Sequence, residues 1–177
     1  MAALPRHPHG GALVPIDETR AFKPVRIAVL TVSDTRTLAD DRSGDTLQQR
    51  IEAAGHQIAD RRIVTDDSDL IVETLAEWIE RDDVDCVIST GGTGVTGRDV
   101  TPEAVEAVCD KIIPGFGELF RWISFAKIGT STIQSRCTAG VARGTYIFAL
   151  PGSSGAVRDG WHHIERAMPG DADGDGR

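Results

Sequence analysis

The chain has 177 residues, in which 19 lysines and arginines stand against 27 aspartates and glutamates, giving a formal net charge of −8. Because no basic stripe is present, nucleic acid is not an expected partner. The longest apolar stretches are of strand length, far below the roughly 20 residues of a membrane span, so no membrane segment is predicted.

Three widely spaced cysteines, Cys86, Cys109 and Cys137, form no disulfide or zinc pattern and favour a reduced, cytoplasmic protein. The first 21 residues are interrupted by prolines and glycines and lack the apolar centre of a signal peptide. We therefore predict one domain over residues 23–168, preceded by an irregular arm at 1–22 and followed by an acidic flexible tail at 169–177.

Regular structure is predicted to begin with a strand at 26–32, whose nearly continuous apolar run is typical of burial on both faces. Strands and helices then alternate, which predicts an α/β fold with a mostly parallel sheet and helices on both faces. The further strands are predicted at 56–64, 84–88 and 145–150, and the helices at 43–54, 69–81, 102–109, 118–125 and 156–167. Residues 40–42 are predicted as loop, residues 129–139 as polar loop or short strand, and Ser68 as a helix N-cap.

The stretch that follows the third strand, residues 89–103, is rich in glycine and threonine. Such a loop lets backbone N–H groups come close to a ligand, and phosphate is the ligand most often bound in this way. Thr101-Pro102-Glu103 has the order of a helix start, with an N-cap residue, a proline in the first turn and an acid. The stretch is therefore predicted to bind an anion, with Arg98 and Asp99 just before the helix.

Two commoner loops fit this stretch less well. Gly92, Gly94 and Gly97 match the G-x-G-x-x-G dinucleotide fingerprint, but that fingerprint belongs after the first strand and inside the start of its helix. A P-loop requires a lysine near its end, and this stretch has none. A solvent-exposed glycine turn without a ligand stays open as the alternative.

Four strand ends are followed by polar segments: Ser-Asp-Thr-Arg at 33–36, Thr-Asp-Asp at 65–67, the glycine-rich stretch, and Pro-Gly-Ser-Ser-Gly at 151–155. Parallel strands place their carboxyl ends at one edge of the sheet, where ligands bind in folds of this class. Carboxylates beside phosphate-binding amides are compatible if Mg²⁺ lies between them. This edge is predicted to collect Asp34, Asp66, Asp67, Asp99, Arg36 and Arg98.

Six motifs, in this order and spacing, resemble the MoaB/MogA family of molybdenum cofactor biosynthesis, and in particular its MoaB branch. They are Ser33-Asp34-Thr35-Arg36, Gly91-Gly92-Thr93-Gly94, Arg98-Asp99-Val100-Thr101-Pro102-Glu103-Ala104, Gly115-Phe116-Gly117-Glu118, Ser135-Arg136 and Pro151-Gly152-Ser153. The resemblance covers residues 24–166. It implies a three-layer α/β/α fold and a homotrimer or homohexamer.

The resemblance also implies an activity, the transfer of AMP from Mg-ATP to the terminal phosphate of molybdopterin before molybdate insertion. Asp66 and Asp99 are then the catalytic residues and the Mg²⁺ ligands, and Arg36, Arg98 and Arg136 are candidates for phosphate contacts. The implied partners are molybdopterin, ATP, further copies of the chain and other molybdenum cofactor enzymes. The implied substrate-binding residues are Ser33, Asp34, Thr35, Arg36, Gly91, Gly92, Thr93, Gly94, Arg98, Gly115, Glu118, Ser135, Arg136, Pro151, Gly152 and Ser153.

A second function fits the same motifs, that of a non-catalytic molybdopterin- or nucleotide-binding carrier or scaffold in the pathway. The retained Asp66 and Asp99 favour the enzyme, because a protein that only binds an anion has little need for carboxylates beside it. A dinucleotide-dependent reductase is disfavoured by the position of Pro102 beyond the glycines.

Overall fold

The computed structural model describes residues 22–167. The predicted arm at 1–22, apart from Phe22, and the predicted acidic tail at 169–177 lie outside these residues. Contacts divide the chain into two compact units, and the unit Pro24–Pro169 contains the elements that follow. Within the described residues, no helix is both long enough and apolar enough to cross a membrane.

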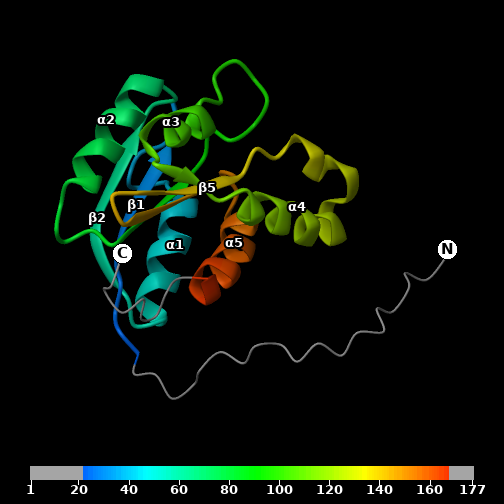
Figure 1. The fold of residues 1–177 in the computed structure, drawn as a ribbon. Helices are drawn as coiled ribbons and strands as arrows, with labels where there is room; N and C mark the ends of the chain where they lie inside the picture. Colours follow the sequence, from blue (N-terminus) through cyan, green and yellow to red (C-terminus); the bar gives the residue numbers. More distant parts are fainter. Residues whose placement is uncertain (1–21, 168–177) are drawn as a thin grey trace. The chain divides into compact units, whose positions relative to one another are not determined.

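The centre of this unit is one six-stranded sheet, which confirms the predicted α/β fold with a mostly parallel sheet (Figure 1). The strand order is β2-β1-β3-β6-β5-β4, and the first four strands run parallel while β5 and β4 are antiparallel to their neighbours. The strands are β1 (Arg26–Val32), β2 (Gln57–Val64), β3 (Cys86–Thr90), β4 (Lys111–Ile112), β5 (Thr138–Ala142) and β6 (Thr145–Leu150).

Helices cover both faces of the sheet, and the alternation of side chains along β1 divides the core between them. Ile27 and Val29 pack on the face covered by α1 (Arg42–Ala53), α4 (Pro114–Ile128) and α5 (Ser154–Ala167). Ala28 and Leu30 pack on the opposite face, under α2 (Ser68–Ile79) and α3 (Thr101–Val108). Both layers are continuous and apolar, which explains why β1 has almost no polar residue in its sequence.

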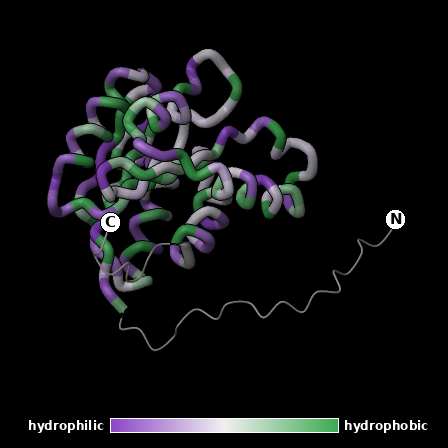
Figure 2. Tube along the Cα trace, viewed as in Figure 1, coloured by the Kyte–Doolittle hydropathy of each residue, from purple (hydrophilic) through white to green (hydrophobic). Residues whose placement is uncertain are grey.

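The edge of the sheet beyond β6 differs from the sequence prediction. Lys111–Ile112 forms the short strand β4, paired antiparallel with β5, where no strand was predicted. The helix predicted at 118–125 begins earlier, with Pro114 in its first turn, and continues to Ile128. The 3₁₀ helix η1 (Gly129–Gln134) follows it. Figure 2 shows hydrophilic and apolar residues mixed along α4 and η1, so helical periodicity is weak there.

Two helix starts also differ from the prediction. Asp41, predicted as loop, is the N-cap of α1 and accepts a hydrogen bond from Gly44 N at 2.9 Å. Asp67, and not Ser68, caps α2, because its Oδ1 accepts from Asp69 N at 2.9 Å and Leu70 N at 3.2 Å. A carboxylate satisfies two amide groups and also favours the positive end of the helix dipole, an advantage that a serine hydroxyl lacks.

The parallel strands end level with one another. Val32 pairs with Val64, Thr31 with Thr90, and Thr90 with Leu150. The segments that follow β1, β2, β3 and β6 therefore leave the sheet at one edge. The strand order reverses at β1, because β2 lies on one side of β1 and β3 and β6 lie on the other. This edge is the place where folds of this class bind their ligands.

Candidate functional site

The glycine-rich stretch turns sharply as it leaves β3. Gly91 and Gly92 have φ angles of +108° and +62°, which side chains other than glycine rarely adopt. A methyl group on Gly91 would overlap the carbonyl oxygen of Val32 in the neighbouring strand. The turn is fixed by α3, because Thr101 Oγ1 donates to Gly91 O and Thr101 N donates to Gly92 O, each at 3.0 Å. Thr101 thus acts as a donor inside the first turn of α3, although the sequence predicted it to be the N-cap.

The segment after β6 packs directly on this turn. A Cβ on Gly152 would lie 3.2 Å from Gly91 Cα, so the two backbones approach as closely as glycines allow. Thr90 Oγ1 donates to Pro151 O at 3.1 Å, and Gly91 N donates to Leu150 O at 3.0 Å. The predicted convergence of these two segments is therefore present.

Carboxylates from the other two strand ends meet the same turn. Asp66 N donates to Asp34 Oδ1 at 3.2 Å, which joins the segments after β1 and β2. Arg98 Nη2 lies 2.6 Å from Asp34 Oδ2 and brings the glycine-rich stretch to them. Asp34, Asp66, Asp99 and Arg98, which we call the acid cluster, are thus drawn from three strand ends. Ser33 and Thr35 continue the first segment, where Ser33 Oγ accepts from Thr35 N at 3.4 Å.

Asp66 is held in an environment that disfavours its charge. Its Oδ1 is buried and has no hydrogen-bond partner, which is rare for a carboxylate oxygen. Burial, followed by the charges of Asp34 and Asp99, raises the pKa of Asp66, with Arg98 acting in the opposite sense. An unpaired buried carboxylate oxygen that faces other acids is suited to a cation or to a proton donated by a ligand.

Asp99, in contrast to Asp66, lies in an environment that favours its charged form. Its Oδ2 accepts hydrogen bonds from Thr96 Oγ1 at 2.6 Å and from Thr96 N at 2.9 Å. These bonds, the side-chain one first, lower the pKa of Asp99 and keep it ionised. A Cβ on Gly94 would lie 2.7 Å from Asp99 Oδ2, so a larger residue there would have to displace this carboxylate. The two predicted catalytic aspartates therefore lie in one cluster with shifts of opposite sign.

Arg136, a predicted phosphate contact, is engaged by the protein itself. Its Nε donates to Gly94 O at 2.5 Å, its Nη2 to Asp99 O, and its Nη1 to the carboxylate of Glu103. Its backbone N donates to Thr93 O at 3.0 Å. In this arrangement Arg136 clamps the glycine-rich stretch from both sides, and its guanidinium has few donors left for a ligand.

Arg36, another predicted phosphate contact, lies beside the start of α1. Its Nη1 is 3.4 Å from Ser43 Oγ and 3.9 Å from Asp41 Oδ1. Asp41 is fully buried and accepts from Thr31 Oγ1 at 2.6 Å and Arg61 Nη2 at 3.0 Å. Burial opposes its ionisation, but these bonds outweigh burial and lower the pKa of Asp41. Sequence reasoning missed Asp41, although an aspartate two residues before Ser43-Gly44 is a recognisable helix-cap signal.

A cavity of about 340 Å³ opens beside the acid cluster, between the glycine-rich stretch, α4, η1 and the start of α5. Five predicted substrate-binding residues line it: Thr93, Gly94, Ser135, Pro151 and Ser153. The Oγ of Ser135 is buried there without a hydrogen-bond partner. Sequence reasoning missed the cavity residues from α4, η1 and α5. Their spacing along the chain does not indicate that they line one cavity. They are Phe120, Ser124, Lys127, Ile128, Thr132, Gln134, Gly155, Ala156 and Asp159.

Glu118, from the fourth motif, lines a different and more open hollow of about 490 Å³. Its neighbours there include Glu106, Arg121 and Ile133, while Ser135 borders both cavities. Gly115 lies in the first turn of α4 and has open space where a Cβ would be. Neither residue lines the cavity beside the acid cluster.

Among the described residues, no three histidine, cysteine, aspartate or glutamate side chains are grouped closely enough to hold a metal ion by themselves. The donor set nevertheless fits Mg²⁺ in part, because the buried Asp66 Oδ1 lacks a partner and Asp34 and Asp99 act on it electrostatically. Mg²⁺ is commonly held by one or two carboxylates together with substrate phosphates and water. Asp66 and Asp99 are the residues that would hold it here.

Comparison with known proteins agrees with this geometry. Residues 28–169 match the model of a family described as a probable molybdopterin binding domain. The chain is 49% identical over 143 residues to molybdenum cofactor biosynthesis protein B of Escherichia coli K12, covering 81% of this chain and 84% of that protein. It is 46% identical over 135 residues to the Bacillus subtilis protein of the same name, covering 76% and 79% respectively.

Solved structures give the same result. A crystal structure of molybdenum cofactor biosynthesis protein B has a TM-score of 0.79 at 43% identity, covering 83% of this chain and 95% of that one. The tungsten cofactor synthesizing protein MoaB of Pyrococcus furiosus has a TM-score of 0.74 at 35% identity, covering 82% and 93%. Together with the six motifs, these matches establish that the chain belongs to the MoaB/MogA family of molybdenum cofactor biosynthesis proteins.

Proposed function

We propose that the chain is a molybdopterin adenylyltransferase, which transfers AMP from Mg-ATP to the terminal phosphate of molybdopterin. The observation that carries this proposal is the acid cluster, in which Asp66 Oδ1 is buried without a partner beside a glycine-lined turn. Anions favour exposed backbone amides, but they disfavour carboxylates unless a cation lies between. A site that holds both groups is suited to a magnesium–phosphate complex.

In the proposed reaction, a terminal phosphate oxygen of molybdopterin forms a bond to the α-phosphorus of ATP. The bond between the α-phosphorus and the bridging oxygen breaks, and pyrophosphate leaves with the electron pair. No group is oxidised or reduced. The protein's part is to position the two phosphates in line and to offset their charge, as in other transfers at phosphorus.

Three side chains of the acid cluster have proposed roles in this reaction. Bound Mg²⁺ would supply charge neutralisation for the phosphates. Asp99, kept ionised by Thr96, and Asp66, whose Oδ1 has no hydrogen-bond partner, would hold that ion. Arg98 is 69% exposed at its side chain and can turn from Asp34 to a phosphate oxygen at little cost, since exposed ion pairs contribute little. We assign Arg36, beside Ser43 at the start of α1, as the other arginine for a phosphate oxygen.

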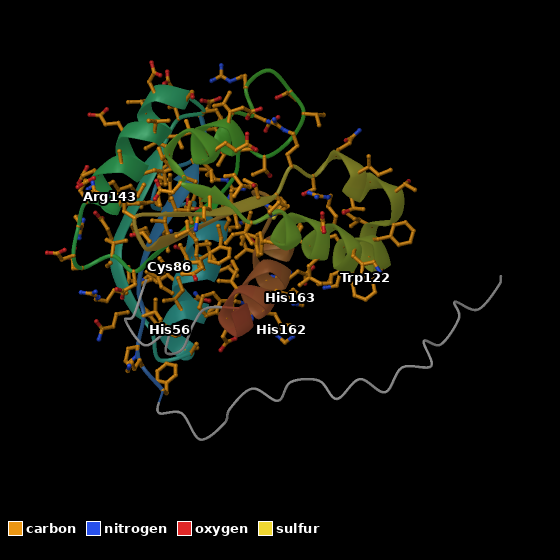
Figure 3. All side chains as sticks on the ribbon, in the orientation of Figure 1. His56, Cys86, Trp122, Arg143, His162 and His163 are labelled. Atoms are coloured by element: carbon orange, nitrogen blue, oxygen red, sulfur yellow. The ribbon has the colours of Figure 1, made fainter. Side chains whose placement is uncertain are left out.

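We further propose that the chain works as a homotrimer or homohexamer in the cytoplasm, in contact with other molybdenum cofactor enzymes. Support for self-association comes from an apolar surface on α4 and η1, formed by Leu119, Trp122, Phe125, Ile128 and Ile133. Trp122 is 75% exposed, and Figure 3 shows it projecting from α4. Several large apolar side chains exposed on neighbouring elements are typical of interfaces. The described cysteines are all free thiols, as in a reducing compartment.

The experiment is to mix the purified full chain with molybdopterin, ATP and Mg²⁺ and to follow adenylylated pterin and pyrophosphate together. Equimolar formation of both products, lost in D99N, is the expected result. Pterin binding should persist in that variant. If the parent chain binds pterin saturably but forms no product, the chain is a carrier or scaffold and not an enzyme.

A further inference from the structure

The cavity beside the acid cluster contains one pair of opposite charges. Lys127 Nζ on α4 lies 2.5 Å from Asp159 Oδ1 on α5. The Asp159 side chain is 21% exposed, whereas that of Lys127 is 61% exposed. No other charged side chain is among the described residues that line this cavity. The two helices therefore present one carboxylate and one ammonium group, side by side, to an otherwise uncharged space.

The remaining wall has the character of a site for a flat ring. Phe120, Ile128 and Pro151 supply apolar surface, and Ser124 supplies a hydroxyl. Ser135 also lines this cavity, and its buried Oγ has no hydrogen-bond partner. A volume of about 340 Å³ lies within the range of small-molecule sites, which combine apolar walls with a few polar groups that fix orientation.

We propose that Lys127 and Asp159 recognise the 2-amino-4-oxo edge of a pterin ring bound in this cavity. This inference rests on the proposed function, because it takes the pterin of molybdopterin as the ligand. That edge carries two adjacent donors, N3–H and the 2-amino group, next to one acceptor, the 4-oxo oxygen. Asp159 accepts from the donors and Lys127 donates to the oxygen, so the charge pattern of the pair matches the ring edge.

The existing ion pair does not prevent this arrangement. A lysine–carboxylate pair with an exposed lysine contributes little to stability, so it rearranges around a ligand at small cost. Asp159 has a second carboxylate oxygen, Oδ2, which the Lys127 bond does not use. The adenine ring of ATP lacks the donor–donor–acceptor edge and would leave Asp159 poorly matched. The pterin therefore binds in the cavity, and the nucleotide phosphates bind at the acid cluster.

The test compares two matched ligands, 6-hydroxymethylpterin and 6-hydroxymethyllumazine, which differ by a 2-amino group in the first and a 2-oxo group in the second. Binding of each to the full chain is measured by fluorescence titration. The parent chain is expected to prefer the pterin by about tenfold or more, because a carboxylate facing an oxo group loses a charge-assisted hydrogen bond. In D159N the preference should fall to about twofold or less, since an amide can donate as well as accept.

Two further variants sharpen the result. K127Q should lower the affinity for both ligands by a similar factor, because both ligands retain the 4-oxo group that Lys127 contacts. D83N is the matched control, since Asp83 forms an exposed ion pair with Arg81 and lines neither cavity. It should leave both affinities unchanged.

The outcomes separate this inference from the proposed function. A D159N protein that keeps the full pterin preference overturns the assignment of the edge, even if adenylylation is normal. A chain that shows the preference and its loss in D159N, yet forms no adenylylated product, supports the assignment and removes the enzymatic proposal. A parent chain that binds neither ligand, or binds both equally, overturns the assignment directly.

Discussion

Gly92 packs against Asp66, so that a Cβ built on Gly92 would lie 2.6 Å from the buried Asp66 Oδ1. The contact joins the glycine-rich stretch after β3 to the segment after β2, which is distant from it in the chain. The conformation of the turn at Gly92 and the environment of Asp66 therefore depend on each other.

Replacing Gly92 with alanine should disturb the turn and the acid cluster together. The φ angle of +62° strains any side chain, and the new methyl group would meet Asp66 Oδ1 and Thr101 Oγ1. We expect a loss of about 1–3 kcal/mol in the free energy of unfolding, with a loss of adenylylation. G97A is the matched control, because a Cβ on Gly97 meets nothing within 4 Å and its φ is not positive. Urea denaturation of both variants measures the difference, and equal stabilities would contradict the packing described.

The variant D66N should unfold at a higher temperature than the parent chain at neutral pH, while losing activity. Because the pKa of Asp66 is raised above its ordinary 3.8 in the folded chain, ionisation costs folding energy as the pH rises through that raised value. Asparagine does not ionise, so the variant escapes this cost, and the gain should vanish as the pH falls below about 3.8. Thermal denaturation between pH 3 and pH 8 tests the sign. A lower Tm at pH 7 would show that Asp66 is not destabilised by its neighbours.

The variant D99N should move in the opposite direction. The ionised carboxylate accepts two hydrogen bonds from Thr96, and its pKa is lowered, so the charge stabilises the folded chain at neutral pH. Its contribution is present above the ordinary pKa of 3.8 and is lost as the pH falls through the lowered value. We expect a loss of about 1 kcal/mol at pH 7 together with the loss of turnover. An unchanged Tm would show that the hydrogen bonds between Thr96 and Asp99 do not stabilise the folded chain.

Arg136→Lys tests whether Arg136 acts on the turn or on the substrate. A lysine cannot bridge Gly94 O, Asp99 O and Glu103 at once, so the glycine-rich stretch should loosen. We expect a lower kcat and a loss of about 1–3 kcal/mol in stability, with KM for ATP little changed. R143K serves as control, because Arg143 forms an exposed pair with Glu80. A rise in KM alone, at normal stability, would instead make Arg136 a substrate contact.

Self-association should depend on the apolar surface of α4. Introducing a charge with W122E places a carboxylate among Leu119 and Phe125 and should dissociate the assembly, because a charge at the centre of an apolar interface is left unpaired. Sedimentation velocity of the parent chain and of W122E measures the change. Mutation of Leu38, an exposed leucine on the segment between β1 and α1, to glutamate is the control. Identical sedimentation of all three proteins would exclude this surface as the interface.

Sequence reasoning placed the four parallel strands and the helices between them with small errors at their ends. It did so because buried parallel strands such as β1 require continuous apolar runs, and caps and glycines mark where they stop. It was less accurate beyond residue 110. There β4 has two residues, and α4 has exposed apolar positions that blur its periodicity. Short antiparallel pairing depends on partners distant in the chain, which local pattern does not encode.

The family, the parallel strands, and the acids and glycines that follow the strands could all be read from the amino-acid sequence, since each is carried by short runs of neighbouring residues. The separate roles of those acids and glycines could not, because they depend on contacts in the folded chain. The tertiary structure assigned Asp67 to a helix cap, Arg136 to a clamp on the turn, and opposite pKa shifts to Asp66 and Asp99. It also brought Lys127 and Asp159 together across two helices. Burial, hydrogen-bond partners and nearby charge set these roles, and each of them is a property of neighbours in space.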